Sequence, residues 1–194
     1  MLGSWTINVY KNLPQKVATA VAQLIEMVGA EYNSIAYLGS QVVNGTNHAV
    51  LCEQTIITGK DVKNIVVVIF NETKEGVTLS GIERVVEGGG EFGGINIYVK
   101  TEIPEEAKAE LDTALEGFLG SKITPVALLG TQVTKGTEYV FVAEIEPVVL
   151  EPEKRVSLIT VNNMTKKVAI VDLLNTRHEE ALVGYAFTWL KAAK

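Results

Sequence analysis

Few residues in this chain could carry out acid–base or nucleophilic chemistry. It contains two histidines, His48 and His178, and one cysteine, Cys52. His48 and Cys52 fall on one predicted strand, which separates them by about 13 Å at about 3.3 Å per residue. Proton transfer needs a heavy-atom separation of about 3 Å, so the two side chains do not form a catalytic dyad. We predict that His48 packs at the start of its strand and that Cys52 is a small buried side chain.

The remaining ionisable residues also give no chemical site. A cysteine-based metal site needs several thiols at short spacing, and the chain has one. Glu102, Glu105 and Glu106 surround the predicted start of a helix, where the helix dipole favours acidic side chains. We therefore predict that the protein is not an enzyme, that it has no catalytic residue, and that it uses no metal and no cofactor.

A glycine-rich stretch in the middle of the chain raises the question of a phosphate-binding loop. Gly90 and Gly93 have the spacing of part of such a motif. The stretch leads into a predicted strand, whereas a phosphate-binding loop must lead into a helix N-terminus. We interpret residues 88–94 as a flexible linker.

The most informative motif is a predicted tight hairpin, Gln41-Val42-Val43-Asn44-Gly45. Asn-Gly between apolar runs is the strongest short-range hairpin signal, because both turn residues must accept a positive φ. A similar stretch returns in the second half of the chain, with the residues Gln132, Val133, Thr134, Lys135 and Gly136. The chain therefore contains two copies of one unit.

Each copy has the same predicted order of elements. In the first copy a strand at residues 6–10 precedes a helix that starts at Pro14, where proline is tolerated in the first turn. Apolar residues at helical spacing then mark one buried face. Two hairpins follow, and the second copy repeats this plan from Ile95. The predicted domains are residues 1–87 and 95–194, joined by the linker at 88–94.

Two features go beyond this plan. Thr176 to Glu179 form a capping-box pattern, and apolar residues at helical spacing then predict an amphipathic C-terminal helix at about 177–193. The runs Ile65–Phe70 and Val168–Val171 are apolar without alternation, so we expect both faces of these strands to be covered. The helix of each copy covers one face. The sister copy, the C-terminal helix or a second chain would cover the other.

The hairpin also resembles a known family. Gln41 to His48 is similar to the Gln-Val-Val-X-Gly-Thr-Asn-Tyr first binding loop of the cystatins, especially the stefin branch without disulfides. The resemblance implies an α+β fold of two tandem cystatin-like units. Each unit would have one helix packed on a curved antiparallel sheet, and the C-terminal helix would be an addition.

The resemblance further implies a function and its site. Cystatins inhibit papain-like cysteine proteases with a hairpin wedge. The implied protease-binding loop is Gln41, Val42, Val43, Asn44 and Gly45, supported by Gly3 and Ser4. A weaker second loop is Gln132, Val133, Thr134, Lys135 and Gly136. The second hairpin of the first copy, Asn71-Glu72-Thr73-Lys74, departs from the family because it lacks the apolar residues that cystatins place there.

Composition limits the choice of partner. The chain has 194 residues, is 47% hydrophobic and carries a net charge of −6. No stretch concentrates lysine and arginine, so we expect neither a nucleic-acid nor a membrane partner. The lone cysteine fits a reducing compartment, and residues 1–5 do not resemble a secretory signal, so we expect a cytoplasmic location.

Two functions remain open at this stage. The first is reversible inhibition of papain-like cysteine proteases through the hairpin at Gln41–Gly45. The second is a structural or interaction module of the same fold that inhibits no protease, since a fold does not imply a function. Both are non-catalytic protein binding. The oligomeric state is also open, and a homodimer made by strand exchange through the hairpin is one alternative.

Overall fold

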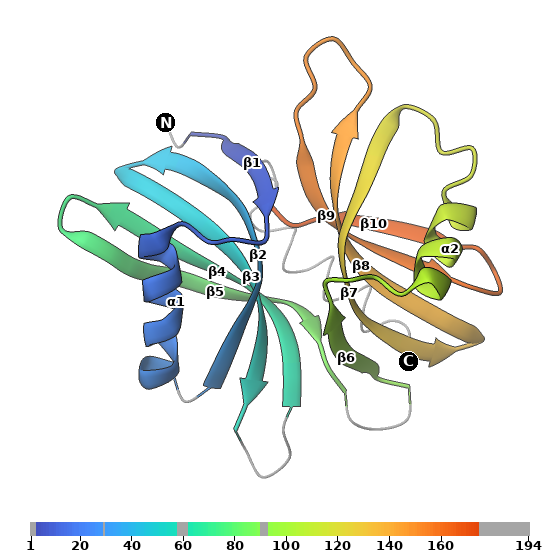
Figure 1. Ribbon diagram of the computed structural model, residues 1–194, viewed down its shortest axis with the longest axis horizontal. Coiled ribbons are helices and arrows are strands. Elements are labelled where there is room, and N and C mark those ends of the chain that lie inside the picture. The colour runs from blue at the N-terminus through green and yellow to red at the C-terminus, as the bar shows by residue number, and fades with distance from the viewer. Residues whose placement is uncertain (1–2, 29, 58–61, 90–92, 175–194) are drawn as a thin grey trace.

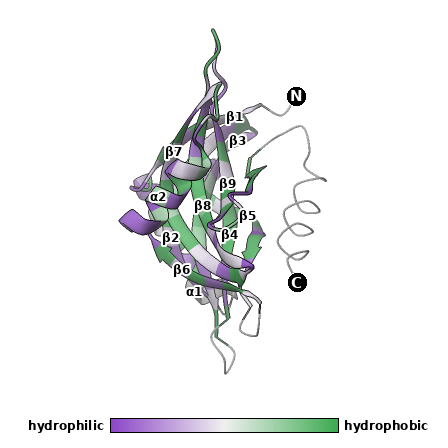
Figure 2. Ribbon diagram, turned by 90° about the vertical axis from the view of Figure 1, so that its right-hand side faces the viewer, coloured by the Kyte–Doolittle hydropathy of each residue, from purple (hydrophilic) through white to green (hydrophobic). Residues whose placement is uncertain are grey.

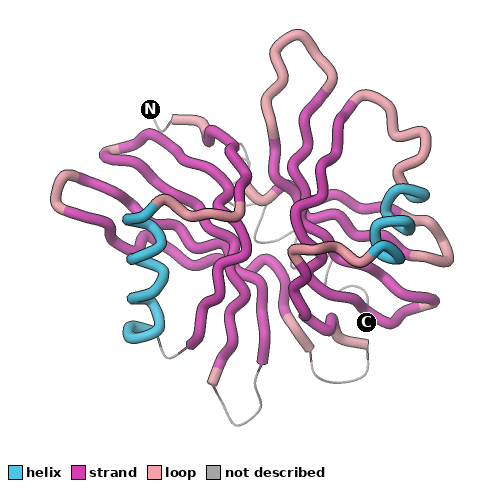
Figure 3. The backbone as a smooth tube through the Cα atoms, in the orientation of Figure 1, coloured by secondary structure: helices cyan, strands magenta, loops and turns pink. Residues whose placement is uncertain are grey.

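The computed structural model describes residues 3–28, 30–57, 62–89 and 93–174. In this part of the chain, strands predominate and only two helices are present (Figure 3). The strands form two five-stranded antiparallel sheets, each built from one half of the chain. The predicted C-terminal helix at 177–193 lies outside the described residues.

The first sheet has the spatial order β1-β2-β3-β4-β5, so every strand pairs with its neighbour along the chain. Its strands are β1 (Trp5–Tyr10), β2 (Ala30–Val43), β3 (Gly45–Ile56), β4 (Val62–Thr73) and β5 (Gly76–Glu87). Helix α1 (Gln15–Val28) connects β1 to β2. Val17, Val21 and Leu24 of α1 are buried against this sheet, as their helical spacing predicts.

The second sheet repeats this topology in the order β10-β9-β8-β7-β6. Its strands are β6 (Ile95–Lys100), β7 (Ser121–Thr134), β8 (Gly136–Pro147), β9 (Arg155–Asn162) and β10 (Val168–Asp172). Helix α2 (Glu105–Ala114) connects β6 to β7 and buries Ala107 and Leu111. Phe118 lies beyond the end of α2 and is exposed.

The two sheets pack face to face with the helices on the outside, which gives four layers (Figure 1). One apolar core lies between the sheets and includes Leu51 and Val67 from the first and Val142 and Leu158 from the second. Two further cores lie beneath α1 and α2. In Figure 2 the strands of the second sheet are largely apolar, and the helix in front of them is more polar.

This packing accounts for the apolar runs without alternation. Along Ile65–Phe70, Ile65 and Val67 enter the core between the sheets, whereas Val66, Val68 and Phe70 enter the core beneath α1. The sister sheet is therefore the cover of the second face. It removes from water a surface that would otherwise promote aggregation.

The packing of the two halves is reciprocal. β1 lies against β9, and β6 lies against β4. β1 and β6 are the first strands of their halves, and β4 and β9 are the fourth, so each half offers the other the same pair of elements. This is the arrangement of an isologous two-fold interface, here formed within one chain.

The fold class predicted from the sequence is wrong. The chain is not an α+β protein of two cystatin-like units: 61% of it is strand, and within the described ranges two short helices accompany the two sheets. The strands are longer than their apolar runs, since the run Ile65–Phe70 extends to Val62–Thr73 in β4. Ladder hydrogen bonds continue through polar residues at the hairpin ends, where side-chain patterns give no signal.

The glycine-rich stretch also has a structural role beyond flexibility. The Gly88 N–H donates to the Lys63 carbonyl at 3.1 Å, and Gly88 bridges to Ile95 at the start of the second half. A Cβ on Gly88 would lie 2.0 Å from that carbonyl oxygen. Glycine is thus required here because the backbones approach closely.

Candidate functional site

The predicted hairpin at Gln41–Gly45 forms, but of its two turn residues only Gly45, and not Asn44, has a positive φ. β2 ends at Val43, β3 begins at Gly45, and Gly45 has φ 101°. Only glycine adopts this conformation without strain. A Cβ on Gly45 would also lie 2.5 Å from the carbonyl oxygen of Glu72 in the neighbouring hairpin, so the two hairpin tips are in close contact.

The N-terminal segment joins the hairpin by two hydrogen bonds. The Gly3 N–H donates to the Val42 carbonyl at 3.2 Å. The Gln41 side-chain amide donates to the Gly3 carbonyl at 2.8 Å. Gly3 therefore continues the β1–β2 ladder beyond the start of β1 at Trp5 and has no room for a side chain.

A row of amide side chains carries this connection across the sheet. The side-chain Nδ2 of Asn47 donates to Oε1 of Gln41 at 3.0 Å, and the side-chain Nδ2 of Asn71 donates to Oδ1 of Asn47 at 2.8 Å. These bonds link β2, β3 and β4. We call the group formed by Gly3, residues 41–45 and residues 71–76 the first hairpin end.

The predicted site residues divide into structural and exposed ones. Gln41 is buried, and its side chain forms hydrogen bonds with Gly3 and Asn47 of the same half. Val42 has 72% of its surface exposed, Asn44 is exposed and Val43 is half-buried. Of the predicted contact residues, Val42 and Asn44 are thus the ones that present side chains outward. Ser4 is exposed and lines a cleft between β1 and the second sheet, which is described below.

A polar network that the sequence analysis missed supports the first hairpin end. His48 Nδ1 lies 2.8 Å from the Tyr37 hydroxyl, and His48 Nε2 lies 3.1 Å from a Glu72 carboxylate oxygen. Lys16 of α1 pairs with the same carboxylate at 2.5 Å. The network connects α1, β2, β3 and β4 beneath the hairpin tips.

Charge and burial shift the pKa values in this network in opposite directions. The hydrogen bond from Lys16 is the main cause that lowers the pKa of Glu72, and His48 adds to it. Burial raises the pKa of Tyr37. Tyr37 thus stays a neutral hydroxyl and Glu72 a carboxylate at neutral pH. His48 itself is buried.

Cys52 is inert. It is fully buried beneath α1, and desolvation raises the pKa of its thiol to about 12. A thiol in this environment supplies almost no thiolate at neutral pH, so it is a poor nucleophile. This agrees with the predicted role of Cys52 as a small buried side chain.

The second half has an equivalent group, the second hairpin end, formed by Gly93, residues 132–136 and residues 162–166. The Gln132 amide donates to the Gly93 carbonyl at 2.6 Å, and Gly136 has φ 95° at the turn. Val133 has 77% of its surface exposed, and Thr134 and Lys135 are also exposed. The bond from glutamine to glycine and the outward valine are therefore present twice.

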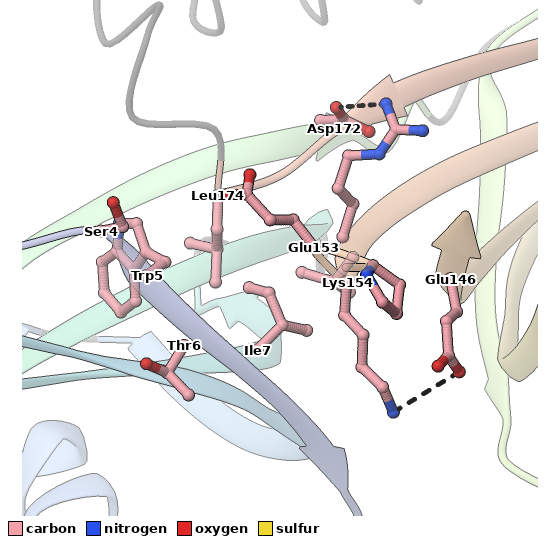
Figure 4. Close-up of a pocket in the computed structure, with 12 residues that line it drawn as sticks. Ser4, Trp5, Thr6, Ile7, Glu146, Glu153, Lys154, Asp172 and Leu174 are labelled. Atoms are coloured by element: carbon pink, nitrogen blue, oxygen red, sulfur yellow. Dashed lines mark hydrogen bonds and ion pairs between the residues drawn. The ribbon is translucent and has the colours of Figure 1, made fainter. Parts of the chain in front are cut away.

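A cleft of about 660 Å³ lies between β1 and the strands β8 to β10 (Figure 4). Trp5, Ile7 and Leu174 line its apolar part. Lys154 faces Glu146 at 3.9 Å at its rim, and Arg155 pairs with Asp172 at 3.4 Å. These four charges thus form two ion pairs at the cleft, and Glu153 adds a further carboxylate to its lining.

The described ranges contain no candidate metal cluster and no membrane-spanning helix. No cluster of three or more histidine, cysteine, aspartate or glutamate side chains there could hold a metal ion. No helix among the same residues is long and apolar enough to cross a membrane.

The first hairpin end presents the exposed side chains of Val42 and Asn44 on a hydrogen-bonded backbone within a mostly β scaffold. Comparison of the chain with protein-family models and with curated proteins finds no match.

Proposed function

We propose that this chain is a non-catalytic protein-binding protein that inserts its first hairpin end into a groove of its partner. Papain-like cysteine proteases are the partner class to test first. The similarity of Gln41–His48 to the cystatin first loop selects this class. The proposal depends on the local geometry of the end and not on membership of the cystatin fold.

The observation that carries the proposal is that Val42 is exposed while its backbone is paired on both sides, with the N-terminal segment and with the opposite strand of the hairpin. Its carbonyl accepts from Gly3, and its partner across the hairpin is Thr46. An apolar side chain this exposed is costly in water and favourable in an apolar pocket, at about 25 cal/mol per Å² of buried area. Because the end is already ordered, docking loses little conformational entropy.

The same bonds explain how such a tip could occupy a protease without being cut. Cleavage requires the scissile carbonyl to reach the oxyanion site and the peptide to distort toward a tetrahedral centre. The Val42 carbonyl is engaged by Gly3, and the turn is closed by Gly45 against Glu72. The hairpin therefore resists the distortion that a substrate undergoes.

The test is a titration of active papain with the purified full chain, followed by hydrolysis of a fluorogenic peptide. We expect inhibition at sub-micromolar concentration. Val42→Asp should weaken it at least tenfold, because a charge would enter an apolar pocket. Val148→Asp is the matched control, since Val148 is 73% exposed and lies in the loop between β8 and β9, outside the end.

Two results would contradict the proposal. One is the absence of inhibition at tens of micromolar by a sample that circular dichroism shows to be folded. The other is inhibition that Val42→Asp and Val148→Asp reduce equally, which would indicate binding elsewhere. The first result would favour the alternative, an interaction module that inhibits no papain-like protease.

A further inference from the structure

The second hairpin end repeats the construction of the first. In each, a buried glutamine donates to the carbonyl of a glycine two residues before the first strand of its half, Gly3 or Gly93. In each, the residue after the glutamine is the exposed valine, Val42 or Val133. A hairpin needs only its turn residues to form, so this repeated support of an outward valine is more than turn formation requires.

The reciprocal packing of the halves determines where the two ends lie. β1 packs on β9 and β6 packs on β4, so each half meets the other through corresponding strands. In Figure 1 the tips of the β2–β3 and β4–β5 hairpins lie at the left, and those of the β7–β8 and β9–β10 hairpins lie at the right. The two ends are therefore at opposite extremes of the longest axis, where two globular partners would not collide.

We propose that the chain is bivalent and binds two partner molecules at once, one at each hairpin end. This inference rests on the proposed function, since it assigns the second end to the same class of partner. It adds a stoichiometry of two partner molecules per chain. It also gives the second half a binding role besides covering the first sheet.

The two sites differ in the residues around the valine. Beside Val133 the second end exposes Thr134 and Lys135, and Met164 of the neighbouring hairpin has 64% of its surface exposed. At the first end the neighbouring tip carries Lys74 and Glu75 in place of an apolar side chain. Met164 therefore gives the second site more apolar contact area, and Lys135 gives it a positive charge. We expect this site to prefer a partner molecule that has acidic groups at the entrance of its groove.

The test uses papain with its active-site thiol blocked by carboxymethylation, mixed in excess with the full chain. Sedimentation velocity should show a complex of two papain molecules per chain. Val133→Asp and Val42→Asp should each reduce this to one per chain, and the double variant should bind none. Val148→Asp, away from both ends, should keep two.

The outcomes separate this inference from the proposed function. A one-to-one complex at saturation that Val42→Asp alone abolishes would overturn bivalency and leave the proposed function standing. A two-to-one complex that neither variant reduces would overturn both, because papain would then bind elsewhere. If the folded chain forms no complex even with unmodified papain, the proposed function fails and the inference fails with it.

Discussion

The two hairpin ends keep the same bond from glutamine to a glycine carbonyl but rest on different supports. Beneath the first end, His48 links Tyr37 to Glu72 through polar contacts. Beneath the second, Tyr139 takes the place of His48 in the sheet and stacks on Phe141, with ring centroids 6.3 Å apart. One support is a hydrogen-bonded network and the other is mainly aromatic packing.

The two ends also differ in the residue that faces the buried glutamine. Gln41 faces Asn47 across the first hairpin, whereas Gln132 faces Glu138 across the second. Burial raises the pKa of Glu138, and the interactions with Thr160 and with the charge of Lys167 offset only part of that effect. The comparison teaches that the backbone geometry of an end can be kept while its support changes chemistry.

The largest expected effect is at the aromatic support. Phe141 is fully buried, so Phe141→Ala should lower the free energy of unfolding by about 3–5 kcal/mol through lost burial and a cavity. Urea denaturation followed by circular dichroism measures this. Tyr139→Phe, which keeps the ring, is the control and should cost much less. A loss below about 1 kcal/mol for Phe141→Ala would mean that the polar residues carry the second end after all.

A smaller loss is expected at the polar support. His48→Phe keeps a ring of similar size but removes both nitrogen contacts, so Tyr37 and Glu72 each lose a partner. The expected cost is about 1–3 kcal/mol, mainly from removing the His48 partner of the buried Tyr37 hydroxyl, because Glu72 keeps its pair with Lys16. The same denaturation experiment applies. A variant as stable as the parent chain would show that His48 contributes through its packing alone.

Acid should weaken the first end through Glu72. Its pKa is lowered in the folded chain, so its contribution to stability is present above the ordinary glutamate pKa of about 4.3. That contribution is lost as the pH falls through the lower folded value. Thermal melts from pH 6 to pH 3 should show this decline, and Glu72→Gln should flatten it. A decline of equal size in both proteins would assign the acid sensitivity to other groups.

Glu138 should have the opposite and smallest effect. Its pKa is raised in the folded chain, so its contribution favours folding below about pH 4.3 and is lost as the pH rises through the folded value. At pH 7, Glu138→Gln should therefore be more stable than the parent, by less than about 1 kcal/mol because solvent screens the partly exposed carboxylate. Melting temperatures at pH 4 and pH 7 test this sign, and a destabilised variant at pH 7 would contradict it.

Some of the candidate site could be predicted from the sequence. Asn44-Gly45 placed the turn correctly, although only Gly45 adopts the positive φ expected of both residues, a conformation that glycine accepts without strain. Helical spacing identified Val17, Val21 and Leu24 as a buried face for the same kind of local reason. The inward role of Gln41 was not predicted, since it depends on Gly3, which is distant in sequence.

The network at His48 shows why the rest could not be predicted. His48 stands opposite Phe70 in the β3–β4 register, and its partner Glu72 lies two residues further along β4. Only the register between strands brings this pair together, and Tyr37 comes from a third strand. A polar residue among apolar neighbours, such as His48, is a signal to search for a cross-strand partner, but it does not identify one.

By itself, the sequence determined the turns, the duplication and the need to cover both faces of strands such as Ile65–Phe70. These follow from backbone preferences and side-chain periods that act within a few residues. Only the tertiary structure decided that the two sheets cover each other, that the chain is mostly β, and that the hairpin ends point apart. Those outcomes depend on strand register and on which apolar faces meet, and both are set by contacts between residues far apart in the chain.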